Sequence, residues 1–144
     1  MHPTDFLRTL DDEKIVAAIR DAESRTSGQI RVWVSRKHID DPLTTARQRF
    51  KKLKMARTKN RNAVLLYFAP RTHKFAIIGD VAVHEKCGDE FWQKVTAQLT
   101  RDIHEMPMTD AIVNAIRSVG DLLSAHFPHE PGGANELPDK VEHD

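Results

Sequence analysis

Cysteine and long apolar stretches are nearly absent from this chain of 144 residues. Its single Cys87 excludes an internal disulfide, which is typical of proteins kept in a reducing compartment. No stretch approaches the roughly 20 apolar residues of a membrane span. Charged side chains also interrupt residues 1–20, so the start of the chain does not resemble a secretory signal peptide. We therefore expect a cytoplasmic protein that does not span a membrane.

Motifs for nucleotide and zinc binding are missing as well. No glycine-rich phosphate loop of the P-loop or Rossmann type occurs. The eight histidines form no paired zinc-ligand pattern. His84 and Cys87 lack a third group that would orient them for nucleophilic catalysis. We therefore expect no organic cofactor and assign no catalytic residue.

Acidic side chains are missing from the middle of the chain. Between Pro42 and Gly79 there are ten Lys and Arg residues and no Asp or Glu, whereas the remainder holds 12 basic and 21 acidic residues. Two interpretations stay open: a solvated helix face paired with acids from the flanks, or a surface for phosphate, nucleic acid or an acidic partner. We expect a protein partner at the basic segment 43–61. Nucleic acid is not expected, because Phe50 is the only aromatic residue there.

The pattern that is present predicts one α/β domain over residues 1–128, followed by a C-terminal tail, 129–144. Helices are expected at residues 12–25, 43–55, 88–106 and 110–126, and strands at 29–35, 62–69 and 75–78, with 81–83 as a further strand segment. The order α-β-α-β-β-α-α contains one parallel, right-handed crossover and one hairpin. Apolar faces on several helices then require a three-layer α/β/α sandwich around a small mixed β-sheet.

Three short segments are predicted to meet at one end of this sheet, because two strands begin there and the third ends there. They are residues 23–29, 58–62 and 79–80. Carboxylate oxygens come from Glu23 and Asp80, and neutral oxygens come from the Thr and Asn side chains between them. Such a mixture suits a hard cation such as Ca²⁺ or Mg²⁺. The neighbouring Arg61 suits a phosphate.

A purely structural role for the same residues is the alternative. Asp80 would then cap the turn after Gly79, and Glu23 would form a salt bridge with Arg61. Asn62 would tie the start of a strand to a loop.

The segments resemble the TPM domain, a family that includes a thylakoid-lumen protein of photosystem II repair and many bacterial proteins. The matching pieces are Thr26-Ser-Gly-Gln-Ile-Arg-Val32, Thr58-Lys-Asn-Arg-Asn-Ala-Val-Leu65, Phe75-Ala-Ile-Ile-Gly-Asp80, Phe91-Trp92 and Phe127-Pro128. The tail segment Asn135-Glu-Leu-Pro-Asp139 resembles the ending of short bacterial members. The resemblance covers roughly residues 6–140 and implies an α/β/α sandwich, divalent-metal binding and an acid phosphatase activity attributed to plant members.

Carried over residue by residue, the resemblance implies that Glu23 and Asp80 hold the metal and that Arg61, Asn62 and Gly79 contact the ligand. Three departures bear on this assignment. Gln29 stands where a Glu is common, Ala63 where a Gly is usual, and Ala82 where a Gly usually follows the Asp. Fewer carboxylates predict weaker binding of a divalent cation.

The leading hypothesis is a stand-alone binding or regulatory module with a weak calcium or magnesium site at this end of the sheet. Two alternatives stay open. The first is a metal-assisted phosphoester hydrolase, in which Arg61 steadies the phosphoryl charge and Asp80 holds the metal or acts as nucleophile. The second is a protein-interaction domain that uses the basic helix 43–55.

Overall fold

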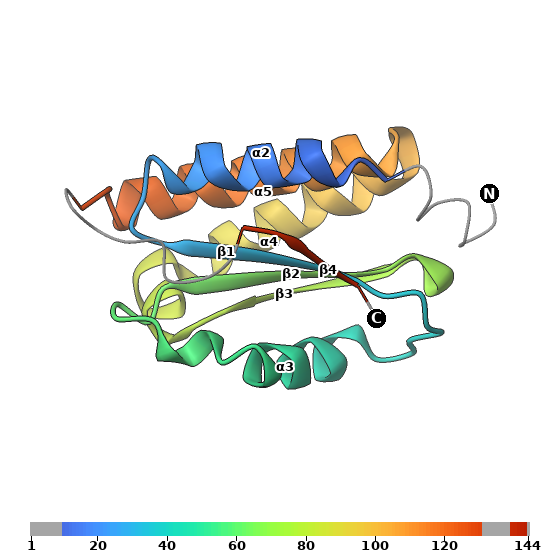
Figure 1. The fold of residues 1–144 in the computed structure, drawn as a ribbon, viewed down its shortest axis with the longest axis horizontal. Coiled ribbons are helices and arrows are strands. Elements are labelled where there is room, and N and C mark those ends of the chain that lie inside the picture. The colour runs from blue at the N-terminus through green and yellow to red at the C-terminus, as the bar shows by residue number, and fades with distance from the viewer. Residues whose placement is uncertain (1–9, 131–138, 144) are drawn as a thin grey trace.

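A four-stranded mixed sheet lies between one helix and a layer of three helices in the computed structural model, which describes residues 10–130 and 139–143. Helix α3 covers one face, and α2, α4 and α5 cover the other (Figure 1). The predicted three-layer α/β/α sandwich is therefore confirmed. The elements in order are α2 (Asp12–Glu23), β1 (Gln29–Val34), α3 (Pro42–Lys52), η1 (Met55–Arg57), β2 (Ala63–Ala69), η2 (Pro70–Thr72), β3 (Lys74–Gly79), α4 (Val81–Glu105), α5 (Met108–His126) and β4 (Val141–His143).

The sheet order is β3-β2-β1-β4. Strands β1 and β2 pair in parallel, as the crossover predicted, and β2 and β3 form the predicted antiparallel hairpin. Strand β4 was not predicted: it pairs in parallel with β1, from Val32 opposite Val141 to Val34 opposite His143. Three residues are too short for a recognisable alternation, so the sequence predicted this segment as part of the tail. In the structure it forms the edge strand next to β1.

Two apolar clusters, one on each face of the sheet, explain why β1 and β2 are buried along their whole length. Alternate residues of β1 such as Val32 pack with α2, α4 and α5, where Ile15 and Ile19 lie on one stripe of α2. The intervening residues, including Trp33, pack with α3 through Ala46 and Phe50. On each face of the sheet, every second strand residue therefore packs against residues that recur about every 3.6 positions along a helix.

Two predicted boundaries around the long helices are wrong. Residues 81–83 form the first turn of α4 and no strand, because the Asp80 side chain accepts a hydrogen bond from the Val81 N–H (2.7 Å) and caps the helix. The helix does not begin at Gly88, which instead interrupts it with φ of 71° and ψ of 167°. The sequence predicts a strand at residues 81–83 because valine favours strands. It also predicts that the helix begins at Gly88, whereas Gly88 lies inside α4.

Thr109 directly precedes the predicted helix 110–126 and is a residue type that often caps helices, but it does not cap α5. Thr109 lies inside the helix, and Pro107 is the residue that precedes its first turn. The Thr109 hydroxyl oxygen instead accepts a hydrogen bond from the backbone N–H of Asp11 (3.1 Å) and so joins the starts of α2 and α5. None of the helices in the described ranges is long and apolar enough to cross a membrane.

Candidate functional site

The three predicted segments do meet at one end of the sheet. Gln29 at the start of β1 lies opposite Ala63 at the start of β2. Gly79 at the finish of β3 lies opposite Val64, and the next backbone N–H, that of Asp80, donates to the Ala63 carbonyl (2.9 Å). We call this end, where β1 and β2 begin and β3 finishes, the site end of the sheet.

Glu23, the last residue of α2, serves the open side of β1. The Ser35 N–H donates to the Phe68 carbonyl of β2. Backbone N–H groups point alternately to the two neighbouring strands, so the Ile30 N–H, five residues earlier, points to the β4 side. Strand β4 begins only opposite Val32, so it does not reach Ile30. The Glu23 carboxyl fills this gap, since its Oε2 accepts the Ile30 N–H (2.8 Å). Glu23 therefore satisfies a strand N–H that would otherwise lack a strand partner.

The second oxygen of Glu23 lies in a carboxyl pair. Glu23 Oε1 and Asp139 Oδ1 are both buried, and neither accepts a hydrogen bond from an N–H or hydroxyl donor of the described residues. Burial, and then the hydrogen bond with Asp139, raise the pKa of Glu23 to about 9. At neutral pH the Glu23 side chain is therefore protonated, and its carboxyl forms a hydrogen bond with that of Asp139.

A second buried charge stands beside this pair on β1. Arg31 is 3% exposed and forms an ion pair with Glu142 of β4. Arg20 of α2 lies 3.7 Å from Asp139, and Lys140 lies 3.3 Å from Glu142. The C-terminal segment is thus attached to α2 and β1 by charged contacts as well as by strand pairing.

Asp80 takes different partners from Glu23. Its carboxyl accepts two hydrogen bonds from the Arg61 guanidinium, at 2.7 Å and 2.8 Å, besides the one from Val81. The carboxylate of Asp80 raises the pKa of Arg61 through this hydrogen bond and its charge. The expected salt bridge between Glu23 and Arg61 is therefore wrong, whereas the expected capping role of Asp80 is confirmed.

Arg61 carries backbone strain at this contact. Its φ is 52°, a left-handed conformation that few non-glycine residues adopt. Its carbonyl accepts the Ala82 N–H (3.2 Å) at the start of α4. The side chain is about half exposed while Asp80 is 5% exposed, so the ion pair connects a buried cap to the solvent.

Asn62 ties the starts of the two parallel strands together, as the structural alternative predicted. It is fully buried, and its Nδ2 donates to the Ser27 hydroxyl (3.2 Å). Its Oδ1 has no hydrogen-bond partner, nor does the buried hydroxyl of Thr58 in the preceding loop. The site end thus contains buried neutral oxygens as well as the buried carboxyl pair.

The two predicted metal ligands lie towards opposite edges of the sheet. Glu23 lies on the β4 side of β1, whereas Asp80 follows β3, so β1 and β2 stand between them. Three strand steps of about 4.8 Å each make this separation roughly 14 Å. No group of three or more His, Cys, Asp or Glu side chains suited to a metal occurs in residues 10–130 and 139–143.

Sequence reasoning did not single out Asp139, Arg31 or Glu142. Arg31 read as one polar position in an alternating strand, and the two acids read as parts of a polar tail. One signal was present, since Asp139 ends the tail segment that carries part of the family resemblance. The burial of Arg31 could not be predicted, because its partner Glu142 lies on β4, far away in the sequence.

Cys87 and the far end of the sheet offer less. Burial raises the pKa of the Cys87 thiol, which makes it a poor nucleophile at neutral pH.

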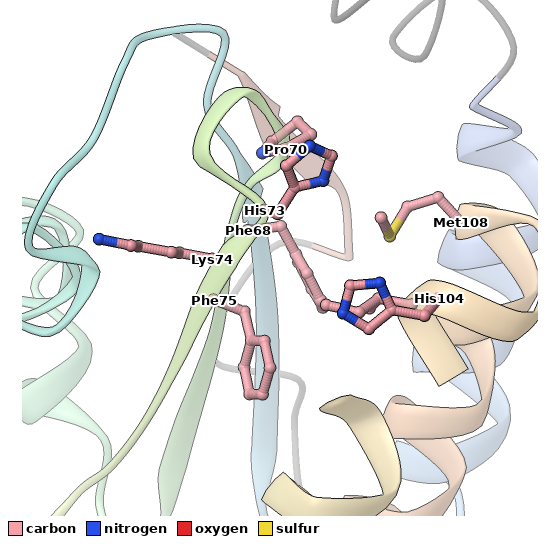
Figure 2. Close-up of a pocket in the computed structure, with 8 residues that line it drawn as sticks. Phe68, Pro70, His73, Lys74, Phe75, His104 and Met108 are labelled. Atoms are coloured by element: carbon pink, nitrogen blue, oxygen red, sulfur yellow. The ribbon is translucent and has the colours of Figure 1, made fainter. Parts of the chain in front are cut away.

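At the end of the sheet opposite the site end, a small cavity of about 20 Å³ is lined by residues that include His73, His104 and Met108 (Figure 2). That volume holds about one water molecule. Lys74 points away from it and donates to the Asp40 carbonyl (2.8 Å).

Comparison with protein-family models matches residues 1–122 to the TPM domain. The chain belongs to the TPM domain family. A comparison with curated proteins found no match. The expected family is therefore confirmed, while metal binding and phosphatase activity stay predictions for this TPM domain.

Two solved structures resemble this TPM domain. One is the BA42 protein from the psychrophilic bacterium Bizionia argentinensis, with a TM-score of 0.86 and 32% sequence identity over 94% of this chain and 96% of that chain. The other is the N-terminal domain of the cg2496 protein from Corynebacterium glutamicum, with a TM-score of 0.53 and 16% identity over 90% of this chain and 75% of that chain. The second likeness concerns the fold alone.

Proposed function

We propose that this TPM domain is a binding module that takes a divalent cation, calcium or magnesium, at the site end of the sheet. The observation that carries the proposal is a set of buried oxygens that accept no hydrogen bond from an N–H or hydroxyl donor of the described residues. Native interiors leave few polar atoms unpaired, and calcium and magnesium are bound by oxygen. The set comprises Glu23 Oε1, Thr58 Oγ1, Asn62 Oδ1 and Asp139 Oδ1.

The carboxyl pair of Glu23 and Asp139 would supply the charge for the cation. Both side chains are held in place, Glu23 by the Ile30 N–H and Asp139 by Arg20. A cation must displace the proton that the pair holds, because metal ligands bind in their deprotonated form. Since the pKa of Glu23 is about 9, binding is weak at neutral pH and strengthens as the pH rises.

The cation would not be bound by Asp80, Arg61 or Gly79, which would lie near the site without contacting the ion. Both oxygens of Asp80 already accept hydrogen bonds, so a cation at Asp80 would have to replace the Arg61 guanidinium. The side-chain amide oxygen Oδ1 of Asn62, in contrast, has no competing donor. In this proposal the cation would bind at the Glu23 and Asp139 carboxyls, on the β4 side of β1.

A metal-assisted phosphoester hydrolase is the second candidate, and one contact favours it. The half-exposed Arg61 guanidinium presents donors that suit a phosphate. Asp80 would have to leave Arg61 and Val81 before it attacked phosphorus, which ranks hydrolysis below binding. Turnover of an aryl phosphate that persists at the wild-type rate in Asp80→Asn would eliminate Asp80 as the nucleophile.

An amide-shift titration by NMR with Ca²⁺ and then Mg²⁺, at pH 7 and again at pH 9, tests the cation site. We expect saturable shifts around Glu23, Ile30, Asn62 and Asp139, with tighter binding at pH 9. Glu23→Gln keeps the size of the side chain but cannot become an anionic ligand, so it should abolish the shifts. Glu13→Gln, the same change on an exposed position of α2, is the matched control. Equal responses in the two variants would contradict the proposal.

A further inference from the structure

Basic side chains dominate the layer on one side of the sheet, and acidic side chains outnumber basic ones in the layer on the other side. Helix α3 and the segment after it contain only basic charges, while the three helices of the opposite layer carry more Asp and Glu than Lys and Arg. Figure 1 shows these two layers on the two faces of the sheet. Among the described residues, no salt bridge joins α3 to an acid from the flanks. The cations of the α3 layer face solvent on a side of the molecule where acids are scarce.

Four of these cations form what we call the α3 basic surface: Arg47, Lys51, Lys54 and Arg57. All four are exposed, and none has an ion pair with a described residue. Arg47 acts on Asp41, the cap of α3, only through space. Arg47 and Lys51 lie one helical turn apart, a spacing at which like charges destabilise a helix. The fold thus tolerates repulsion here without a salt bridge to an acid among the described residues.

The helix beneath this surface is held rigidly on the sheet. The Arg49 guanidinium lies 5.1 Å and the Lys52 ammonium 6.0 Å from the centre of the Trp33 ring, and Trp33 itself is buried in β1. Phe50 and Ala46 of the same helix are buried in the cluster below. The exposed cations therefore project from a fixed platform, which reduces the entropy that a partner must overcome on binding.

We propose that the α3 basic surface binds an acidic, carboxylate-rich segment of a partner protein. A single-stranded nucleic acid would want exposed aromatic rings for stacking, and the rings nearest to this surface, Trp33, Phe50 and Tyr67, are all buried. A lipid surface would want a broad apolar face to insert, but the large apolar side chain exposed on α3 is Leu43 alone (43%). One leucine beside a row of cations matches an acidic peptide that carries an apolar residue.

Fluorescence anisotropy with a labelled peptide of Glu and Leu residues tests the partner class. The controls are the same peptide with Gln in place of Glu, a DNA duplex, and vesicles of phosphatidylserine and phosphatidylcholine. We expect the Glu peptide to bind, to weaken with added salt, and to shift amide signals of α3. Tighter binding of the duplex or of the vesicles, or no binding of the Glu peptide, would overturn the proposal.

Two triple variants separate this surface from bulk charge. Arg47→Glu with Lys51→Glu and Lys54→Glu should lower the affinity at least about tenfold, because rim charges steer and hold such complexes. Lys94→Glu with Arg101→Glu and Arg117→Glu makes the same change in net charge on exposed positions of α4 and α5, and we expect little loss. Equal losses would refute the assignment. The milder Arg47→Gln with Lys51→Gln decides the matter if the first triple variant does not fold.

Discussion

Glu23 and Asp139 form a hydrogen-bonded carboxyl pair at the junction of α2 and β1, where the C-terminal segment leads into β4, and each has one buried oxygen that no N–H or hydroxyl of the described residues reaches. Carboxyls from residues 116 positions apart in the chain thereby meet at the open side of β1. This contact links the sheet, the C-terminal segment and the proposed cation site.

Protein stability should fall as the pH rises toward 9. The folded-state pKa of Glu23 is raised from 4.5 to about 9, so the stabilisation is complete below the unfolded value and is lost as the pH passes the folded value. The slope attributable to one proton is at most about 1.4 kcal/mol per pH unit. Urea unfolding at a series of pH values measures it. Glu23→Gln should flatten the slope, Glu13→Gln should not, and a slope unchanged by Glu23→Gln would show that another group is responsible.

Removing the partner of Asp80 should destabilise the fold. Arg61→Met leaves a carboxylate that is 5% exposed with only its N-cap hydrogen bond, and we expect a loss of about 1–3 kcal/mol in the free energy of unfolding. Arg57→Met, at an exposed position without an ion pair to a described residue, should cost about 0.5 kcal/mol or less. Chemical denaturation measures both. Comparable losses would mean that the ion pair contributes little.

The close approach of α2 and α5 should show a strong coupling between Ala22 and Gly120. A Cβ atom on Gly120 would lie 2.7 Å from the Ala22 Cβ, so Gly120→Ala must push the helices apart. Overpacking costs about 1–3 kcal/mol, whereas the gain in helix propensity returns only about 1 kcal/mol. We expect net destabilisation in the single variant.

The combined variant Gly120→Ala with Ala22→Gly exchanges the two side chains across the contact and relieves the clash. A double-mutant cycle of unfolding free energies should therefore be non-additive in the stabilising direction, by more than about 0.5 kcal/mol. Additive values would indicate that the helices accommodate the extra methyl group without cost.

Loss of the β4 ion pair should loosen the C-terminal strand. Glu142→Gln leaves the Arg31 guanidinium buried without its counter-charge, and we expect a loss of about 1–3 kcal/mol. Amide hydrogen exchange should accelerate at Val32 and Val34, which face β4 across the pairing. Glu130→Gln removes one exposed contact to Asn60 instead and serves as the control. Unchanged exchange in Glu142→Gln would show that strand pairing alone holds β4.

Local patterns were sufficient for most of the architecture. Alternation in 29–35 and the apolar run in 62–69 identified the two central strands. The sequence offered Asp11 or Asp12 as the cap of α2, and the structure shows Asp11. The connection rules then required the starts of β1 and β2 to meet the finish of β3, and the registers confirm it. The start of α4 was missed because Val81 and Val83 favour strands in isolation, whereas the Asp80 cap favours the helix.

The sequence by itself determined the family, through the segments that resemble the TPM domain. It also determined the layer order and the end of the sheet at which Glu23, Asn62 and Asp80 gather, because these follow from periodicity and from the hand of short connections. Only the tertiary structure decided which groups become partners. Asp80 pairs with Arg61, and Glu23 with Asp139, because side-chain direction at a strand edge depends on neighbouring strands. A strand of three residues pairs with β1 and supplies the partner of the buried Arg31, and such long-range pairing leaves no local mark in the chain.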